Sequence, residues 1–183
     1  MAKLPSREQL VQTTKKQIGD LIKPNLKLLF CGINPGLYSA YSGYHFGRPG
    51  NRFWRVLFLS GFTKRLLHPS EQKEVLSLGY GITNLVDRPS VSAAELTVEE
   101  YVAGGKRLES KIKEFKPAWV AFVGVEAYRK AFSRPKASMG KQDHIIKGAS
   151  VWVVPSPSGL NAHYTVADLT QVFQELHDAI ESV

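Results

Sequence analysis

The chain has 183 residues, of which 43% are hydrophobic, and a formal net charge of +8. This length and composition predict a single globular domain with an ordinary core. No window approaches the roughly 20 apolar residues that span a bilayer, which excludes a membrane-spanning protein, and the N-terminus shows no signal-peptide pattern. We therefore expect an intracellular protein, cytoplasmic and nucleoid-associated if bacterial, with no membrane partner.

The charge is unevenly distributed along the chain. Residues 41–67 carry five cations and no acid, whereas residues 151–183 carry four acids and no Lys or Arg. We expect one basic face, with the last segment turned away from it. A basic face suits a phosphate polymer, because neutralising phosphates releases counterions. An ordinary solubilising surface is the alternative explanation.

The elements in chain order begin with a segment of weak pattern. Residues 1–25 show little apolar periodicity and are predicted to form a helical extension, and residues 26–183 to form one domain. Four apolar runs then have the near-continuous character of strands covered on both faces of a parallel sheet. They are residues 26–33, 80–86, 118–124 and 151–155.

The single cysteine, Cys31, lies inside the first of these runs. In that position it is predicted to be a small buried hydrophobic residue and not a metal ligand or disulfide partner. We expect neither a metal nor a cofactor.

Helical patterns separate the predicted strands. One begins near Asn51, a plausible N-cap, and stops at Gly61, a typical C-terminal signal. The others are residues 70–79, 97–115, 125–132 and 166–183, while residues 134–150 are predicted to be an exposed basic connection. This alternation predicts a three-layer α/β/α sandwich around a mostly parallel sheet of four to five strands.

In this fold class, ligands bind beyond the carboxyl ends of the strands. The first such position holds GINPG, residues 32–36, in which Asn34 follows a strand and precedes a Pro-Gly turn. Asn34 could serve the turn itself, but Pro35 and Gly36 already supply one. An amide oxygen can hold a water by one of its protons without removing that proton efficiently. Asn34 therefore suits a reaction in which the water needs placement more than activation.

Aromatic side chains follow directly after this turn. Tyr38, Tyr41, Tyr44 and Phe46 alternate with glycines at spacings that match neither a strand nor a helix. Such rings can simply fill a core. A flat ring at the edge of a strand-end pocket also suits a nucleobase, which stacks on aromatic side chains with about 1–3 kcal/mol.

A second loop, residues 155–164, follows the last predicted strand and has the sequence PSPSGLNAHY. Ser156, Ser158 and Gly159 offer hydroxyls and unhindered backbone N–H groups that can bind phosphates. Leu160 is apolar among polar neighbours, as expected of a wedge that fills the gap left by an extruded nucleotide. Asn161 is predicted to contact DNA beside it.

Together these segments resemble a known family. GINPGLYSAYSGYHFGRPGNRFW (32–54), GITNLVDRP (81–89) and PSPSGLN (155–161) are similar to the mismatch-specific uracil-DNA glycosylases and thymine-DNA glycosylases of the uracil-DNA glycosylase superfamily. The resemblance runs from about Leu28 to the C-terminus. It implies a monomeric, monofunctional glycosylase that flips uracil, or thymine or ethenocytosine, opposite guanine out of double-stranded DNA and hydrolyses its N-glycosidic bond.

The resemblance also implies roles for individual residues. Asn34 matches the asparagine that positions water, and Phe46 the ring that stacks on the flipped base, whose edge is read by backbone amides of Ile33 and Phe46. Ser39 shapes the pocket floor, and Asn84 matches a position beside the base that holds an amide or a lysine. Leu160 matches the intercalating residue, and Gly159 a backbone contact to the unpaired guanine.

This chain departs from the family pattern at two positions. Ser156 stands where the motif often begins with Asn, and the arginine that can follow the wedge has no match at Ala162 or His163. These departures put the contact with the opposite guanine in doubt, and specificity for mismatched over single-stranded DNA is expected to be relaxed.

Three titratable residues near the motifs have alternative interpretations. His45 and His163 could act as general acids, but phosphate or pocket-wall contacts are more typical of histidines in such loops. Asp87 could be an assisting carboxylate, but pairing with Arg88 or capping a turn is more typical.

Two other functions remain open at this point. A non-catalytic lesion-binding module would need the aromatic platform and the wedge but not Asn34. A nucleotide-binding protein would use GINPG as a phosphate loop, although the segment lacks the glycine spacing and lysine of such loops.

Overall fold

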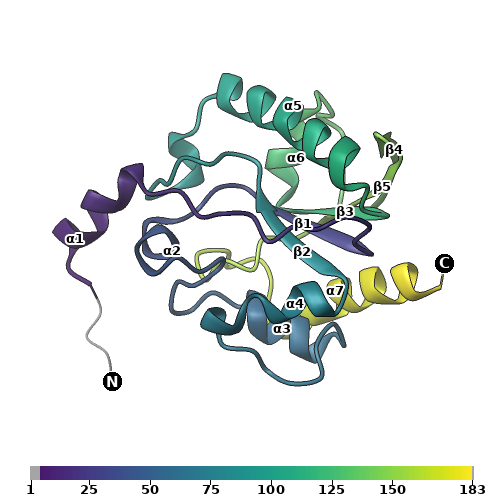
Figure 1. Ribbon diagram of the computed structural model, residues 1–183, viewed down its shortest axis with the longest axis horizontal. Helices are drawn as coiled ribbons and strands as arrows, with labels where there is room; N and C mark the ends of the chain where they lie inside the picture. Colours follow the sequence, from purple (N-terminus) through teal and green to yellow (C-terminus); the bar gives the residue numbers. More distant parts are fainter. Residues whose placement is uncertain (1–4, 183) are drawn as a thin grey trace.

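The computed structural model describes residues 5–182, which fold around a five-stranded sheet (Figure 1). The order across the sheet is β2 (Tyr80–Asn84), β1 (Leu28–Gly32), β3 (Trp119–Val123), β5 (Ala149–Val154) and β4 (Gly140–Ile146). The first four strands are parallel, and β4 pairs antiparallel with β5. The predicted α/β class with a mostly parallel sheet is confirmed.

Two buried layers of side chains lie on opposite faces of this sheet. In β1, Leu28 and Phe30 belong to one layer, whereas Leu29 and Cys31 belong to the other. Alternate residues of a strand point to opposite faces, so a strand covered on both sides must be apolar throughout. Cys31 is buried as predicted, and burial raises the pKa of its thiol.

Helices cover both faces of the sheet (Figure 1). On one side lie α3 (Phe53–Leu59), α4 (Glu74–Ser77) and α7 (Val166–Glu181); on the other lie α5 (Val98–Phe115) and α6 (Val125–Ala131). Shorter 3-10 turns are η2 (Pro69–Glu71) and η3 (Ala93–Glu95). Between residues 5 and 182, no helix is long and apolar enough to cross a membrane.

Local signals fix where these helices begin. Thr97 and Thr165 form capping boxes at the starts of α5 and α7. The Asn51 Oδ1 atom accepts a hydrogen bond of 2.9 Å from the backbone N–H of Phe53, so Asn51 caps α3 from just outside the helix. These contacts satisfy backbone donors that the first helical turn leaves unpaired.

The basic and acidic segments are neighbours in space, and the expectation that the last segment is turned away from a basic face stays a prediction. α3, from the basic segment, packs against α7, and the Phe53 and Phe173 rings meet edge to face with centroids 6.4 Å apart. The apolar stripes of the two helices determine their placement, because burial of those stripes outweighs weak surface charge effects.

The segment 134–150 is not simply an exposed connection, because it contains the edge strand β4. Alternate side chains of β4 are exposed, and its sequence GKQDHII carries charged and polar residues. An edge strand with one face in solvent needs little apolar character, and charges there discourage pairing with another chain. For these reasons, hydrophobic content gave no signal for this strand.

The N-terminal region contains α1 (Arg7–Val11) and η1 (Gln12–Lys15). Further along, Leu21 is buried and exchanges two backbone hydrogen bonds of 2.8 Å with Ile82 of β2. Asp20 pairs with Lys111 of α5 at 2.6 Å. This segment therefore packs along the edge of the sheet, and the division of the chain at residue 25 stays a prediction.

Candidate active site

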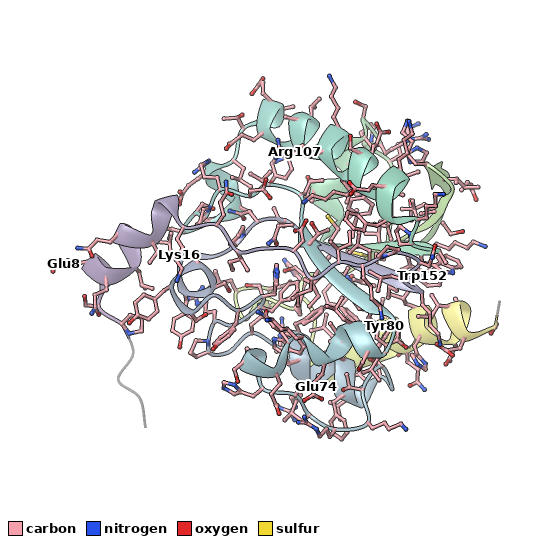
Figure 2. All side chains as sticks on the ribbon, viewed as in Figure 1. Glu8, Lys16, Glu74, Tyr80, Arg107 and Trp152 are labelled. Atoms are coloured by element: carbon pink, nitrogen blue, oxygen red, sulfur yellow. The ribbon has the colours of Figure 1, made fainter. Side chains whose placement is uncertain are left out.

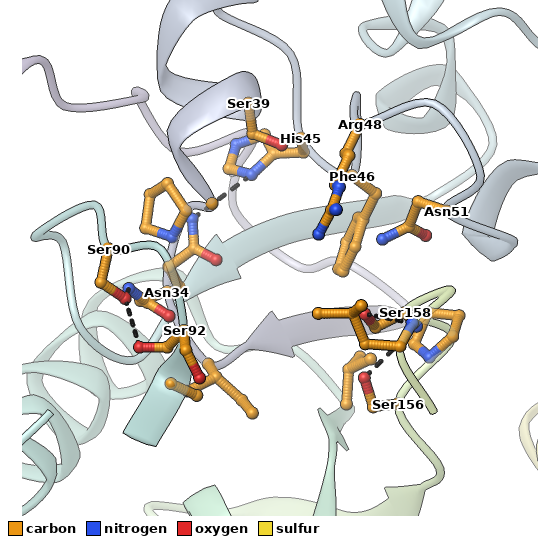
Figure 3. Close-up of a pocket in the computed structure, with 18 of the residues that line it drawn as sticks. Asn34, Ser39, His45, Phe46, Arg48, Asn51, Ser90, Ser92, Ser156 and Ser158 are labelled. Atoms are coloured by element: carbon orange, nitrogen blue, oxygen red, sulfur yellow. Dashed lines mark hydrogen bonds between the residues drawn. The ribbon is translucent and has the colours of Figure 1, made fainter. Parts of the chain in front are cut away.

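A cavity of about 350 Å³ opens at the carboxyl ends of the parallel strands, where the fold class predicts a ligand site (Figure 3). Nine of the ten site residues predicted from sequence line it, and Gly159 does not. These nine residues are Ile33, Asn34, Ser39, Phe46, Asn84, Ser156, Ser158, Leu160 and Asn161. The fold thus brings together segments more than 100 residues apart.

Asn34 follows β1 and is held by its amide nitrogen. Its Nδ2 atom donates to the carbonyl oxygen of Arg88 at 2.9 Å and to the hydroxyl of Ser90 at 2.8 Å. The Ser90 hydroxyl in turn donates to the carbonyl of Ser92 at 2.8 Å (Figure 3). Both amide protons of Asn34 and the hydroxyl proton of Ser90 therefore have an acceptor.

This arrangement leaves the amide oxygen of Asn34 available to a ligand. Among the residues and side chains that the structure describes, no donor is hydrogen-bonded to it. An amide whose two N–H groups are fixed can only accept a hydrogen bond at its oxygen, with an orientation that the protein has already set. Asn34 is thus able to hold a water by one of its protons.

Phe46 forms an aromatic wall of the cavity. Its ring stacks on that of Phe53 with centroids 3.9 Å apart and planes 20° from parallel. Figure 3 shows it across the pocket from Asn34, on the same side as Ser156 and Ser158. One face of the ring is thus covered by protein while the side chain as a whole is half-buried.

The backbone at Phe46 is strained, with a φ of 51°. A bulky residue rarely adopts this left-handed conformation, which persists only where neighbouring contacts impose it. Here the N–H of His45 donates to the side chain of Gln72 at 2.8 Å, and its carbonyl accepts from the Trp54 indole at 3.0 Å. The conformation of Phe46 is therefore built into the pocket before any ligand binds.

His45 is almost fully buried, with 2% of its surface exposed. Burial lowers the pKa of its imidazole, so the ring is neutral at pH 7. Its Nε2 atom lies 3.0 Å from the carbonyl oxygen of Gly19, which can only accept, so this nitrogen carries the proton. The other nitrogen, Nδ1, lies 3.5 Å from Nδ2 of Asn84 and faces it as an acceptor. His45 therefore serves as a pocket-wall residue and not as a proton donor to the cavity.

Asn84 ends β2, beside Gly32 at the end of β1. A Cβ atom on Gly32 would lie 2.7 Å from the Asn84 Oδ1 atom and 3.4 Å from the Phe46 ring. Only glycine leaves room at this point, so the GINPG motif also opens the space that Asn84 and Phe46 occupy.

Ser39 lies on α2 (Leu37–Ser42), a short helix in a segment whose spacing predicted only a loop. Its hydroxyl accepts a hydrogen bond of 3.2 Å from the N–H of Gly47, which ties the helix to the strand-end loop behind Phe46. The sequence did not predict this helix, because its six residues are too few to show a helical period.

The second loop is braced from within. The Asn161 amide donates to the Ser156 carbonyl at 2.9 Å, and the hydroxyls of Ser156 and Ser158 accept from the N–H groups of Ser158 and Leu160. The Asn161 side chain is thus engaged in the loop itself. Leu160 projects outward, with 71% of its surface exposed.

Gly159 lies in the loop but outside the cavity lining. A Cβ atom there would lie 2.9 Å from the carbonyl oxygen of Gly50, so the position requires a residue without a side chain. This contact joins the second loop to the first, on the outer side of the pocket.

Asp87 takes no part in the cavity lining. Its carboxylate lies 3.6 Å from Arg107, whereas Arg88 pairs with Glu100 at 2.7 Å. The expected pairing of Asp87 with Arg88 is therefore wrong, because the chain between β2 and α5 directs these neighbours to different partners. The described residues that line the cavity include no carboxylate, and Arg48 is their one fully charged side chain.

Sequence reasoning missed Ser90, Ser92 and Ile18, which also line the cavity. Ser90 lies 56 residues beyond Asn34 in a segment without regular pattern, so only the folded chain shows their contact. Over residues 5–182, no three His, Cys, Asp or Glu side chains are grouped so that they could hold a metal ion.

Comparison with known proteins identifies the family of this chain. The family model of the uracil DNA glycosylase superfamily matches residues 20–177. The chain belongs to this superfamily. Membership supports DNA glycosylase activity on uracil and a DNA substrate.

A solved structure shows the same fold. The solution NMR structure of a candidate uracil DNA glycosylase from Methanosarcina acetivorans superimposes on this superfamily member with a TM-score of 0.58. The alignment covers 89% of this chain and 98% of that one, at 20% sequence identity. At that identity the likeness establishes the fold alone.

Proposed function

We propose that this member of the superfamily is a monofunctional glycosylase of the mismatch-specific type, which removes uracil opposite guanine from double-stranded DNA. It acts as a monomer inside the cell and leaves an abasic site that begins base excision repair. The observation that carries the proposal is the fixed amide of Asn34, whose oxygen is left as an acceptor at the mouth of an aromatic-walled cavity.

Base flipping is expected from the position of the site at the carboxyl ends of the strands. A base inside a duplex cannot reach a cavity at the ends of the strands, so the nucleotide must leave the stack. Phe46, held flat by Phe53, then stacks on the flipped base. Ile33, Ser39 and Asn84 contact the base from the remaining walls and the floor.

Hydrolysis then breaks the bond between C1′ of the sugar and N1 of the base. The base leaves with the bonding electron pair, and the sugar becomes oxocarbenium-like. The water held by Asn34 forms the new bond to C1′ and loses a proton to solvent, while the departing base takes up a proton. Because the described cavity lining has no carboxylate to act as a strong base, Asn34 contributes placement more than activation.

The leaving group therefore limits the reaction. The described lining residues include no carboxylate and one arginine, Arg48, so the cavity tolerates negative charge on the departing base. We expect slow turnover and preference for bases that are stable as anions, with uracil ahead of thymine. Whether ethenocytosine is accepted depends on the space that the cavity leaves beside the flipped base.

The exposed Leu160 fills the gap that the flipped nucleotide leaves. Ser156, Ser158, Gly159 and Asn161 form the phosphate- and guanine-facing loop around it. Since no arginine follows the wedge, we expect the contact with guanine to be weaker than in family members that have this arginine. Uracil in single-stranded DNA is therefore also expected to be removed.

A direct assay separates this function from its main alternative. The protein is incubated in excess with a duplex that carries one radiolabelled uracil opposite guanine, and free uracil is measured over time. We expect release of free uracil and an alkali-labile abasic site. A non-catalytic lesion-binding module would bind the same duplex without releasing uracil, and that result would overturn the proposal.

The nucleotide-binding alternative has no support in the site geometry. The GINPG turn lies beside Phe46 and Asn84, and its Asn34 side chain is anchored to residues 88 and 90. Affinity for a free nucleotide, without affinity for duplex DNA, would favour that alternative.

A further inference from the structure

The guanidinium of Arg52, a half-buried side chain, forms hydrogen bonds with the loop that carries the wedge. Arg52 directly precedes α3, more than 100 residues away in sequence. Its Nη2 atom donates to the carbonyls of Ser158 at 2.7 Å and Asn161 at 2.9 Å. Its Nε atom donates to the carbonyl of Pro157 at 3.2 Å, and Nη1 to that of Tyr164.

The backbone of Arg52 adds a further contact, since its N–H donates to the same Pro157 carbonyl at 3.0 Å. Between residues 5 and 182, no carboxylate forms a salt bridge with Arg52. Within the described residues, its side-chain partners are therefore all backbone carbonyls of the loop. Charge-assisted hydrogen bonds of this kind are stronger than neutral ones, and the planar fork of arginine serves several acceptors at once.

The four carbonyl groups that point to Arg52 fix the direction of the N–H group in each of the same peptide units. A trans peptide is planar, with its N–H directed away from its C=O. The carbonyls of Ser158 and Asn161 point to Arg52, so the N–H groups of Gly159 and Ala162 point away from it. Both residues are exposed and flank Leu160 closely in sequence. The N–H groups that follow the other two carbonyls are bonded within the chain, Ser158 to Ser156 and Thr165 to Asp168.

We propose that Arg52 is a positioning residue that organises residues 157–164 into a preformed DNA-binding loop, with Leu160 as the wedge and the N–H groups of Gly159 and Ala162 as donors to a phosphodiester. The inference rests on the proposed function for the identity of the ligand. The rigidity of the loop is independent of the proposed function, because it can be measured without DNA.

Arg52→Lys tests the proposal, because lysine keeps the charge but cannot form the planar fork. Arg55→Lys is the matched control, since Arg55 lies three residues further along and is exposed on α3. Arg52→Gln is a second variant that keeps a planar donor without the charge. Thermal unfolding of all three shows whether the fold is retained.

The first measurement is amide hydrogen exchange of the DNA-free protein. We expect the hydrogen-bonded amides of the loop, at residues 158, 160, 161 and 163, to exchange about tenfold faster in Arg52→Lys than in the wild type or Arg55→Lys, because loss of the fork opens the loop locally. Exchange in the sheet should not change. If the loop keeps its protection in both Arg52 variants, Arg52 does not position it and the proposal is wrong.

The second measurement is single-turnover release of uracil as a function of enzyme concentration. We expect Arg52→Lys to raise the half-saturating concentration about tenfold and to lower the maximal rate less than that. If Arg52 acts through the wedge loop, adding Leu160→Ala should cost little more, whereas independent effects would multiply. Multiplicative effects would overturn the proposal. Absence of uracil release by the wild type would instead count against the proposed function, with the exchange experiment still deciding the role of Arg52.

Discussion

At the scale of single residues, the site depends on an amide with a fixed orientation. Asn34 is anchored through Ser90, which is itself anchored to the Ser92 carbonyl. We expect Ser90→Ala to lower the maximal single-turnover rate of uracil release about tenfold. The Asn34 amide then loses one of the two hydrogen bonds that fix the direction of its oxygen. The half-saturating enzyme concentration should change little.

Ser77→Ala is the matched control for this change. Ser77 is exposed on α4, and its hydroxyl donates to the carbonyl of Glu74. The control should keep the wild-type rate. If Ser90→Ala kept it as well, the anchoring of Asn34 through Ser90 would have no catalytic consequence.

His45 provides a prediction about pH. Burial lowers the pKa of His45 from its ordinary value of 6.5 in the folded protein. Below about pH 6.5 the unfolded chain therefore binds a proton more readily than the folded one, and stability falls as the pH drops toward the folded pKa. The stability contributed by neutral His45 is fully present above about pH 6.5.

We expect the free energy of unfolding, measured by urea denaturation, to fall between pH 7.5 and pH 5.5. His45→Gln, which cannot titrate, should reduce this fall while other groups keep their contributions. An equal fall in wild type and variant would show that His45 is not held neutral by its surroundings.

At the scale of elements, the beginning of α7 links the wedge loop to the core. Thr165 caps α7, and Leu169 and Phe173 of the helix are fully buried. We expect Thr165→Ala to lower the free energy of unfolding by about 1 kcal/mol, because the first turn loses its side-chain acceptor. Thr165→Ser keeps the hydroxyl and should lie close to the wild type. Equal losses in both variants would contradict a capping role.

The elements also show how far sequence reasoning reaches. The four parallel strands could be predicted because strands buried on both faces must be apolar, as Leu28 and Val120 are. The edge strand β4 and the short helix α2 could not, because exposure removes the hydrophobic signal and six residues are too few for periodicity. The packing of α3 against α7 could not be predicted either, because the number of charges in a segment does not determine which distant helix it contacts.

At the scale of the whole molecule, two loops far apart in sequence meet over one cavity. Asn34 and Phe46 could be predicted from their motif, and the fold places both in the cavity lining. The anchors Ser90 and Arg52 depend on contacts over 56 and more than 100 residues. Figure 2 shows how densely side chains fill the space between the helices and the sheet, which fixes these distant segments relative to one another.

We propose that Asn34 places the water that attacks the sugar. The most direct test is single-turnover release of uracil from a duplex with one uracil opposite guanine, with wild type and Asn34→Ala at saturating concentration. We expect the variant to lose at least about 100-fold in rate, a size typical of a lost positioning contact, while its affinity for the duplex changes less than about threefold. Full activity of Asn34→Ala would show that Asn34 does not place the attacking water.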